Sequence, residues 1–290
     1  MWTPRFALLL AAGAVVAGLA LRAAGSTGRA RSGRWAGPAA PYLLGAGGVI
    51  ALYGVWQLAL DALVVHTAGA VGRGASIARF EGRLGLPSEA AVQRLALHLP
   101  GLVRMANLFY NYLDFPALSA TLGWLFWRHR DRFAHYLATL VALTAMCAAI
   151  QAIPVAPPRL VPGFGFIDTG RLFNQAVYLP GAGDPGVLTT MPSVHVAWAA
   201  YVAVVIAAAS TSSRRWLAIA HPVVTMVVVV VTGNHFWADG VVALLIVALT
   251  LALQAGVAAV VEGRRKSGRI GADTMREQSN RFASREVGNG

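Results

Sequence analysis

The sequence predicts an all-α membrane protein with about seven transmembrane helices. Hydrophobic residues make up 57% of the 290 positions and charged residues only 12%, and the mean hydropathy is +0.59. That composition lies outside the range of soluble domains. The second observation is a series of apolar stretches, each close to the 17 to 25 residues that cross the hydrocarbon layer. They lie near 6–21, 42–65, 106–127, 133–153, 194–210, 216–232 and 237–261.

One membrane domain accounts for most of the chain. We expect a first transmembrane helix and a basic cytoplasmic loop in 1–41, a membrane domain in 42–262, and a basic cytoplasmic tail in 263–290. The tail lacks apolar periodicity and is expected to be disordered. The net charge of +12 comes from short clusters between apolar runs, a pattern that argues against nucleic-acid binding. Cys147 is the single cysteine, so no intramolecular disulfide can form.

Basic clusters set the predicted orientation. If the spans simply alternate, all four clusters fall on one side, which the positive-inside rule assigns to the cytoplasm together with the C-terminus. This is the topology of an integral plasma-membrane or inner-membrane protein. An alternative is that residues 1–24 are a cleaved signal peptide, which would place two of the clusters outside. The clusters are Arg22, Arg29, Arg31 and Arg34; Arg128, Arg130 and Arg132; Arg214 and Arg215; and Arg264, Arg265, Lys266 and Arg269.

Two short helices are predicted between the second and third spans. Gly85 can end the first helix and Ser88 can cap the second. Their apolar residues recur at helical spacing, which is typical of helices that lie on a membrane surface. Both a packing role and a substrate-gating role remain open for them. The recurring residues are Ile77, Phe80 and Leu84 in the first helix, and Val92, Leu95, Ala96 and Leu99 in the second.

Three polar clusters lie at span ends, and the alternating topology brings all three to the outer membrane face. Polar groups are costly within a membrane, so such clusters are candidates for function. We therefore expect the active site on the outer face. The clusters are Ala156-Pro157-Pro158-Arg159 after the fourth span, Met191-Pro192-Ser193-Val194-His195 before the fifth, and Thr232-Gly233-Asn234-His235-Phe236-Trp237-Ala238-Asp239 before the seventh.

The third cluster contains a candidate nucleophile. His235 and Asp239 are four residues apart, a spacing that on a helix places both side chains on one face. The carboxylate can hold one imidazole N–H and leave the other nitrogen free to attack phosphorus. His195 lies one turn inside a helix that starts near Ser193, where free N–H groups favour phosphate oxygens. There it can act as general acid and then as general base.

Other uses of these residues remain open. A histidine four residues before an aspartate is also common as a structural hydrogen bond or a proton path. Arg159 offers a permanently charged fork for phosphate, but an interfacial arginine can equally be an anchor. Metal-dependent phosphate enzymes normally supply several carboxylates, and only Asp168 and Asp184 are spare in the facing loop. We therefore expect a reaction that needs neither a metal ion nor another cofactor.

At these residues the chain resembles the type 2 phosphatidic acid phosphatase superfamily. That family has a Lys followed at a distance by Arg-Pro, then Pro-Ser-Gly-His, then Ser-Arg with a His and an Asp four residues later. The branch it most resembles is related to the fungal inositol phosphorylceramide synthases. The residues that carry the resemblance are Pro157-Pro158-Arg159, the segment Pro162 to Thr169, Met191-Pro192-Ser193-Val194-His195, and Thr232 to Asp239.

The resemblance implies a helical core and specific roles. His235 would be the nucleophile, Asp239 its partner and His195 the acid, with Arg159 and Ser193 in contact with phosphate. Two departures stand out, because the family's first Lys aligns with Ala152 and its third-motif Arg with Val229. Each missing charge-assisted hydrogen bond is ordinarily worth about 1.5 to 3 kcal/mol. The available replacement donors are backbone N–H groups, Asn234, Thr232, Gln151 and Arg171.

Further polar residues are candidates for binding an acceptor or head group. Asn107, Tyr110, Asn111 and Asp114 recur at helical spacing in the outer half of the third span, and an intramembrane carboxylate is a functional candidate. An interhelical hydrogen bond is the alternative for Asp114. Asp168 and Thr169 are expected to cap a short helix through Arg171 and Val177, and both Asp168 and Arg171 are head-group candidates. His221, which follows Arg214 and Arg215, is expected on the side away from the three clusters.

The predicted function is phosphoester chemistry on a membrane lipid. Hydrolysis and transfer share their first half-reaction, so the residues do not separate a phosphatase from a phosphotransferase. The expected substrate is a phospholipid, a polyprenyl phosphate or a phosphoinositol-type lipid. A non-catalytic lipid transporter or scaffold that keeps the fold is the alternative from another class. The sequence does not indicate an oligomeric state.

Overall fold

The computed structural model describes residues 4–26, 67–177 and 185–261, with scattered positions between 43 and 58. Within these residues the chain is helical, and the one extended pairing is an isolated parallel bridge between Val155 and Thr189. The chain divides into two compact units, Met1–Val247 and Ala248–Gly290. The tail at 263–290 and most of the predicted second span and first basic loop lie outside the described residues, as does Asp184.

Three helices in the described part are long and apolar enough to cross a membrane. They are α7 (Arg130–Gln151), the stretch Ser213–Val231, and the last helix, Trp237–Val261. The second stretch consists of the 3-10 helix η3 (Ser213–Ile219) and α10 (Ala220–Val231). These three agree with predicted spans. Two further helices, α1 (Pro4–Ser26) and α9 (Val194–Ala209), contain an apolar stretch that is shorter than those three helices.

The third predicted span is wrong as a single continuous helix. The structure has α5 (Pro100–Tyr112) and α6 (Asp114–Arg128), which meet at Leu113. Pro116 explains the interruption, because it has no N–H for the Tyr112 carbonyl and its ring crowds that carbonyl. Tyr110 therefore ends one helix and Asp114 begins the next.

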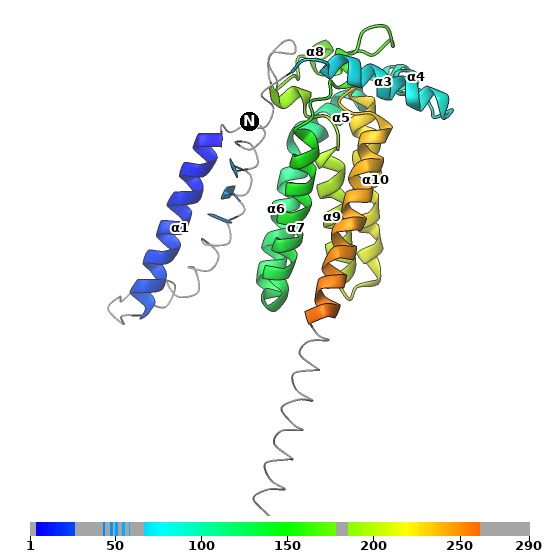
Figure 1. Ribbon diagram of the computed structural model, residues 1–290. Helices are drawn as coiled ribbons and strands as arrows, with labels where there is room; N and C mark the ends of the chain where they lie inside the picture. Colours follow the sequence, from blue (N-terminus) through cyan, green and yellow to red (C-terminus); the bar gives the residue numbers. More distant parts are fainter. Residues whose placement is uncertain are drawn as a thin grey trace, which may run out of the picture. The chain divides into compact units, whose positions relative to one another are not determined.

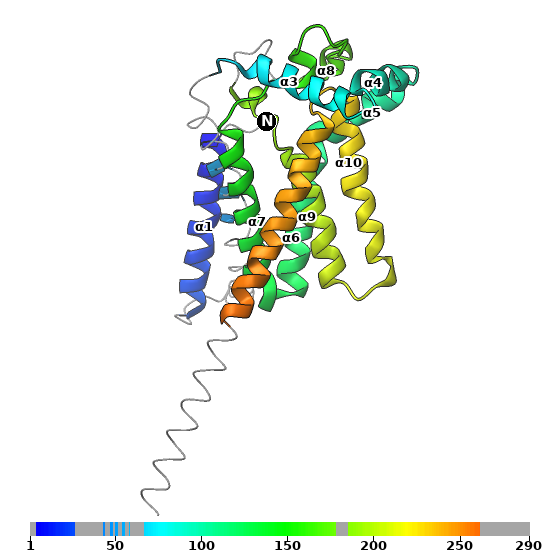
Figure 2. The same cartoon turned by 45° about the vertical axis from the view of Figure 1, so that its right-hand side comes forward.

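Helices α6, α7, α9 and α10 run alongside one another, as Figures 1 and 2 show. Helix α9 contacts the other three and is apolar all round, the pattern of a helix surrounded by protein. Its larger side chains hydrogen-bond to α7: Trp198 Nε1 donates to Thr144 Oγ1 at 3.1 Å, and the Tyr201 hydroxyl donates to the Tyr136 carbonyl at 2.8 Å. This packing fixes the start of α9, where His195 lies.

Short elements gather at the end of the bundle where α7 ends and α9 begins (Figures 1 and 2). These are α3 (Ala70–Arg83), α4 (Glu89–Leu97), α8 (Thr169–Leu172) and the 3-10 helices η1 (Pro158–Leu160) and η2 (Pro185–Leu188). Helix α3 packs closely on the loop before η1, since a Cβ on Gly74 would lie 2.7 Å from the Ala156 carbonyl oxygen.

The two predicted surface helices are present. Unlike amphipathic helices on the surface of a soluble protein, they turn several polar side chains toward the protein interior. Phe80 and Leu95 are 55% and 72% exposed, whereas Glu81, Glu89 and Gln93 are buried. Each apolar stripe is thus divided: Phe80 and Leu95 face outward, as suits a membrane-surface helix. Ile77 and Val92 pack against the core instead. The polar side chains point into the protein.

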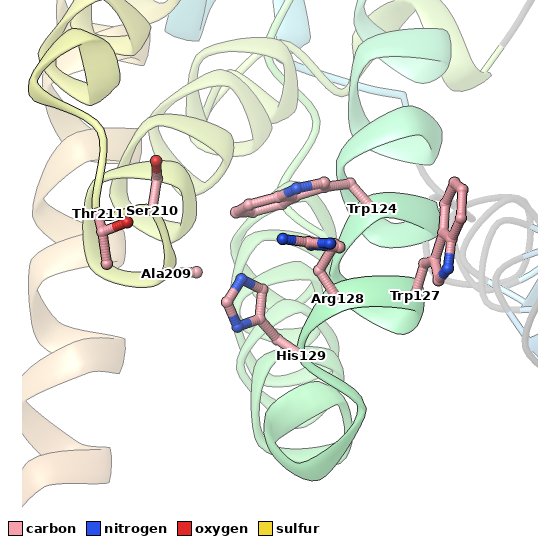
Figure 3. A pocket seen from close by; sticks show the side chains of 7 residues that line it. All are labelled: Trp124, Trp127, Arg128, His129, Ala209, Ser210 and Thr211. Carbon is pink, nitrogen blue, oxygen red and sulfur yellow. The ribbon is translucent and has the colours of Figure 1, made fainter.

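A pocket of about 420 Å³ lies at the opposite end of α6 and α9 from His195. Figure 3 shows the Arg128 side chain between the rings of Trp124 and His129. Tryptophan and arginine at helix ends are typical of a membrane–water boundary. The other lining residues are Trp127, Ala209, Ser210 and Thr211.

Candidate active site

His235 and Asp239 are in contact. Nδ1 of His235 lies 3.2 Å from Oδ2 of Asp239, and that oxygen also accepts the Phe236 N–H at 2.9 Å. The predicted geometry differs in one respect, because His235 lies two residues before the last helix rather than on it. Asp239 is the third residue of that helix and reaches back to the residue before its first turn, as in half of a capping box. The helix start thereby holds the ring.

The turn before His235 depends on a glycine. Gly233 has φ +69°, and a Cβ there would lie 3.1 Å from Gln93 Nε2 and 3.2 Å from the Ile167 carbonyl oxygen. The carbonyl of Val229 accepts the N–H groups of both Asn234 and His235, at 3.0 and 3.1 Å. The chain thus reverses tightly after α10, and the direction of the His235 backbone is fixed.

His195 faces the same point from the first turn of α9. The ring centroids of His195 and His235 are 5.9 Å apart, and Tyr110 stacks on His195 at 4.3 Å. Ser193 is the N-cap of α9, where its Oγ accepts the Val196 N–H, and its own N–H donates to the Asp239 carbonyl at 3.1 Å. That last bond links the two helices that carry the histidines and Asp239.

Arg159 is the cation nearest to this group. Its side chain is 5% exposed. Nη1 donates to Oδ1 of Asn234, and Nε lies 4.0 Å from Oδ2 of Asp168. Asn234 Nδ2 in turn donates to Thr232 Oγ1 at 2.8 Å. Asn234 therefore orients the arginine, and Arg159 is the group that can bind an anion.

Gln151 does not match its predicted role as a phosphate donor. Its Nε2 donates to the carbonyls of Thr189 and Pro192, at 3.1 and 3.0 Å, so both amide hydrogens are used. The side chain instead holds the loop that leads into α9. Among the predicted backbone donors of the described chain, the N–H groups of Val194 and His195 have no partner. A phosphate beside His195 can use them.

Three of the predicted head-group residues stabilise the loop after η1. Asn111 Nδ2 donates to the Gln175 carbonyl at 2.9 Å. Asp168 caps α8 by accepting the Arg171 N–H at 3.0 Å, as predicted, and also lies 3.4 Å from Arg171 Nε. Arg171 is partly exposed to the outside of this loop. The contacts of these residues account for the position of the loop beside α5.

Asp114 differs, because its charge acts on His195 and His235 and its carboxylate contacts α10. The prediction put His221 apart from the site residues, yet its Nε2 lies 3.4 Å from Asp114 Oδ1. The break at Leu113 allows this contact, since α6 begins beside the first turn of α10. Apart from His221, the Asp114 carboxylate has no partner in the described chain, and neither has the buried Thr225 hydroxyl one turn further along α10.

Sequence reasoning missed Gln93, Glu81 and Glu89. Gln93 is fully buried: its Nε2 donates to the carbonyls of Ile167 and Val231, both at 3.0 Å, and its Oε1 accepts the Ile167 N–H at 2.8 Å. The signal was a polar side chain at the edge of the apolar stripe of each surface helix, a position that is read as solvent-facing in a soluble protein.

The electrostatic environment keeps His235 neutral. Burial lowers the pKa of its imidazole to about 3, the nearby charge of Arg159 lowers it further, and a hydrogen bond with the Thr190 backbone offsets part of this effect. At neutral pH the ring therefore carries a lone pair, as a nucleophile requires.

A family model described as the PAP2 superfamily matches residues 75–253, which is more than half of the chain. No curated protein matches, and no solved structure matches. The matched range includes both histidines, Asp239 and Arg159, as well as the two surface helices from Ala75 onward.

Proposed function

Because the chain belongs to the PAP2 superfamily, we propose that it is a lipid-phosphate phosphatase or phosphotransferase that acts through a phosphohistidine on His235. Membership suggests phosphatase-type chemistry on a lipid phosphate, and the apolar helices suggest an integral membrane protein. The observation that carries the proposal is the neutral His235 held by Asp239, with His195 facing it.

The first half-reaction forms a bond between nitrogen and phosphorus. With a hydrogen on Nδ1 donated to Asp239, the lone pair lies on Nε2 of His235 and attacks the phosphorus atom. The ester P–O bond breaks, and the departing alkoxide takes a proton from the imidazolium of His195. Asp239 stabilises the positive charge that develops on the His235 ring.

The second half-reaction returns both histidines to their initial state. Water or an alcohol attacks the phosphohistidine, His195 takes the proton of that nucleophile, and the P–N bond breaks. From a monoester substrate the product is inorganic phosphate with water or a new monoester with an alcohol. From a diester substrate it is a monoester with water or a new diester with an alcohol. Both outcomes use the same residues.

Phosphate binding would rest on fewer cations than the family motifs supply. Arg159 presents its guanidinium beside Asn234, and the free N–H groups of Val194 and His195 start α9. A helix start and a guanidinium together suit a phosphate dianion. Ser193 and Asn234 complete the proposed phosphate contacts, and the bound anion favours the protonated form of His195.

An acceptor hydroxyl would bind on the side of Tyr110 and Asp114. Tyr110 stacks on His195. The Asp114 carboxylate, which is buried and has only His221 near it, is an acceptor for a hydroxyl hydrogen. This polar side supports transfer to a polyol such as inositol as the second outcome beside hydrolysis.

Trapping the intermediate tests the proposal. Purified protein incubated with a lipid labelled at phosphorus and quenched in alkali, where phosphohistidine survives, should carry the label on His235. His235→Ala should lose both the label and turnover, and His98→Ala, on the exposed end of α4, should keep them. If His235→Ala and Asp239→Ala leave every lipid turnover intact, the protein is a transporter or scaffold instead.

Two further measurements define the reaction. A lipid phosphate labelled at phosphorus, incubated with and without inositol, distinguishes free phosphate from inositol phosphate, the monoester that transfer would form. We propose a metal-independent reaction on the outer membrane face, since the nucleophile is held by a single carboxylate rather than by a set of metal ligands. EDTA should leave activity intact, and a reporter phosphatase fused after Arg130 should stay inactive because that loop is then cytoplasmic.

A further inference from the structure

The first three N–H groups at the start of the last helix are each accepted by a different carboxyl group. Asp239 accepts from Phe236 at 2.9 Å, Glu89 Oε1 from Trp237 at 3.3 Å, and Glu81 Oε1 from Ala238 at 2.6 Å. The N–H groups of a helix's first turn have no partner within the helix, so they need acceptors from outside. Here two of the three come from α3 and α4.

The two glutamates are buried for this contact. Glu81 is 3% exposed and Glu89 is 5% exposed, while apolar neighbours such as Phe80 and Leu95 face outward. Burying a carboxyl group is unfavourable unless it is hydrogen-bonded. The turn between α3 and α4 adds a third link, because Trp237 Nε1 donates to the Pro87 carbonyl at 2.9 Å. The two surface helices and the turn between them are thus hydrogen-bonded to the first turn of the helix that carries Asp239.

Glu81 has acidic neighbours. The titratable groups that act on it are Glu89 from α4, to which it hydrogen-bonds, and Asp239 from the last helix. Burial and these neighbours raise the pKa of the Glu81 carboxyl to about 9, although the Ala238 N–H opposes the shift. Glu81 therefore carries a proton at neutral pH, which it can donate to Glu89.

We propose that Glu81 and Glu89 are positioning residues for the phosphohistidine reaction: by accepting the N–H groups of Ala238 and Trp237, they fix the helix start that aims Asp239 and His235. This inference rests on the proposed function. It makes α3 and α4 part of the catalytic apparatus and gives the enzyme an alkaline limit. When Glu81 loses its proton, the repulsion between its carboxylate and Glu89 loosens the helix start.

Neutral and apolar replacements of Glu81 separate positioning from simple packing. Glu81→Leu removes the acceptor of the Ala238 N–H, and kcat should fall about tenfold or more with little change in KM. Glu81→Gln keeps an acceptor and offers an N–H to Glu89, so it should restore most of the activity that leucine loses. Asp131→Asn, on an exposed side chain at the far end of the bundle, is the matched control.

The pH profile is the readout that a packing role would not move. The wild-type protein should lose kcat with a midpoint near pH 9, and Glu81→Gln should shift that loss to higher pH. An independent check is the infrared C=O stretch of a protonated carboxyl group, which the wild type should show at pH 7 and Glu81→Gln should lack in part. This check holds even if Glu81→Leu does not fold.

Two results would overturn the inference. One is an alkaline limb that is identical in the wild type and Glu81→Gln, and the other is wild-type kcat in Glu81→Leu. The proposed function fails separately, when His235→Ala keeps its turnover. A protein in which His235 is essential but Glu81 is not therefore contradicts the positioning role alone.

Discussion

Oδ2 of Asp239 lies 3.2 Å from Nδ1 of His235 and 2.9 Å from the backbone nitrogen of Phe236. One carboxylate oxygen thus orients the imidazole ring and caps the helix on which the aspartate stands. The orientation of His235 and the start of the last helix are coupled through this atom. A change at Asp239 is therefore expected to affect the chemistry more than the fold.

Asp239→Asn should lower kcat by about 10²- to 10⁴-fold, because an amide cannot fix the same imidazole tautomer or stabilise the charge on the ring. The amide has nearly the same shape, so thermal unfolding in detergent should change little. Initial rates on a lipid phosphate measure the effect, with Asp131→Asn as control. A loss of less than threefold would show that His235 does not depend on this partner.

Arg159→Lys should raise KM and lower kcat, with a combined loss of about 10- to 100-fold in kcat/KM. A lysine has no planar fork, so it cannot contact Asn234 and a phosphate oxygen together. Competitive inhibition by inorganic phosphate should weaken in parallel. Arg171→Lys, on the partly exposed side chain beside Asp168, should change both constants much less.

Gly233→Ala should destabilise the protein by about 1–2 kcal/mol, because a Cβ is unfavourable at positive φ. The site adds crowding from Gln93 and Ile167. Gly72→Ala is the matched control, since a Cβ there, in the first turn of α3, meets nothing within 4 Å. Thermal unfolding in detergent should show a lower Tm for the first variant and an unchanged or higher Tm for the second.

Gln93→Leu should destabilise by about 3 kcal/mol or more, since each buried partner left without a hydrogen bond costs about 1–3 kcal/mol. The groups affected are the Ile167 N–H and the carbonyls of Ile167 and Val231. His98→Leu, on the exposed end of the same helix, should be nearly neutral. Equal Tm values for the two variants would contradict the role given to Gln93.

The free energy of unfolding should fall as the pH drops from about 6.5 toward 3. The unfolded chain takes up a proton on His235 near its ordinary pKa of 6.5, while in the folded protein burial lowers that pKa to about 3. Between these values the unfolded state binds more protons. His235→Gln should remove part of this slope, and His98→Gln should leave it unchanged, as measured by denaturation at a series of pH values.

The membrane character and the key residues follow from the sequence alone. Composition and apolar run lengths predict the long helices α7, Ser213–Val231 and Trp237–Val261, and these are present. His235, Asp239 and His195 are recognisable because polar side chains at the ends of apolar runs are rare. Their positions along the chain also follow from alternating spans, because every second crossing returns the chain to the same end of the bundle.

Tertiary structure decided how these residues are held. The contact of His235 with Asp239 comes from a helix cap and a tight glycine turn, not from two positions on one helix face. Gln151 and Asn111 were predicted to contact the substrate. In the structure their side-chain amides donate instead to the carbonyls of Thr189, Pro192 and Gln175, which are remote along the chain. Sequence spacing cannot show which partner satisfies a buried amide.

Sequence spacing also did not show how the surface helices pack or which residue Asp114 contacts. Periodicity in α3 and α4 identifies an apolar face, but only the packing shows that part of this face is exposed and that Glu81, Glu89 and Gln93 turn inward. The contact between Asp114 and His221 joins residues that are more than 100 positions apart. The sequence by itself determined which residues are chemically unusual for a membrane protein. The tertiary structure alone decided their partners, because hydrogen bonds and burial depend on distances between elements that are remote along the chain.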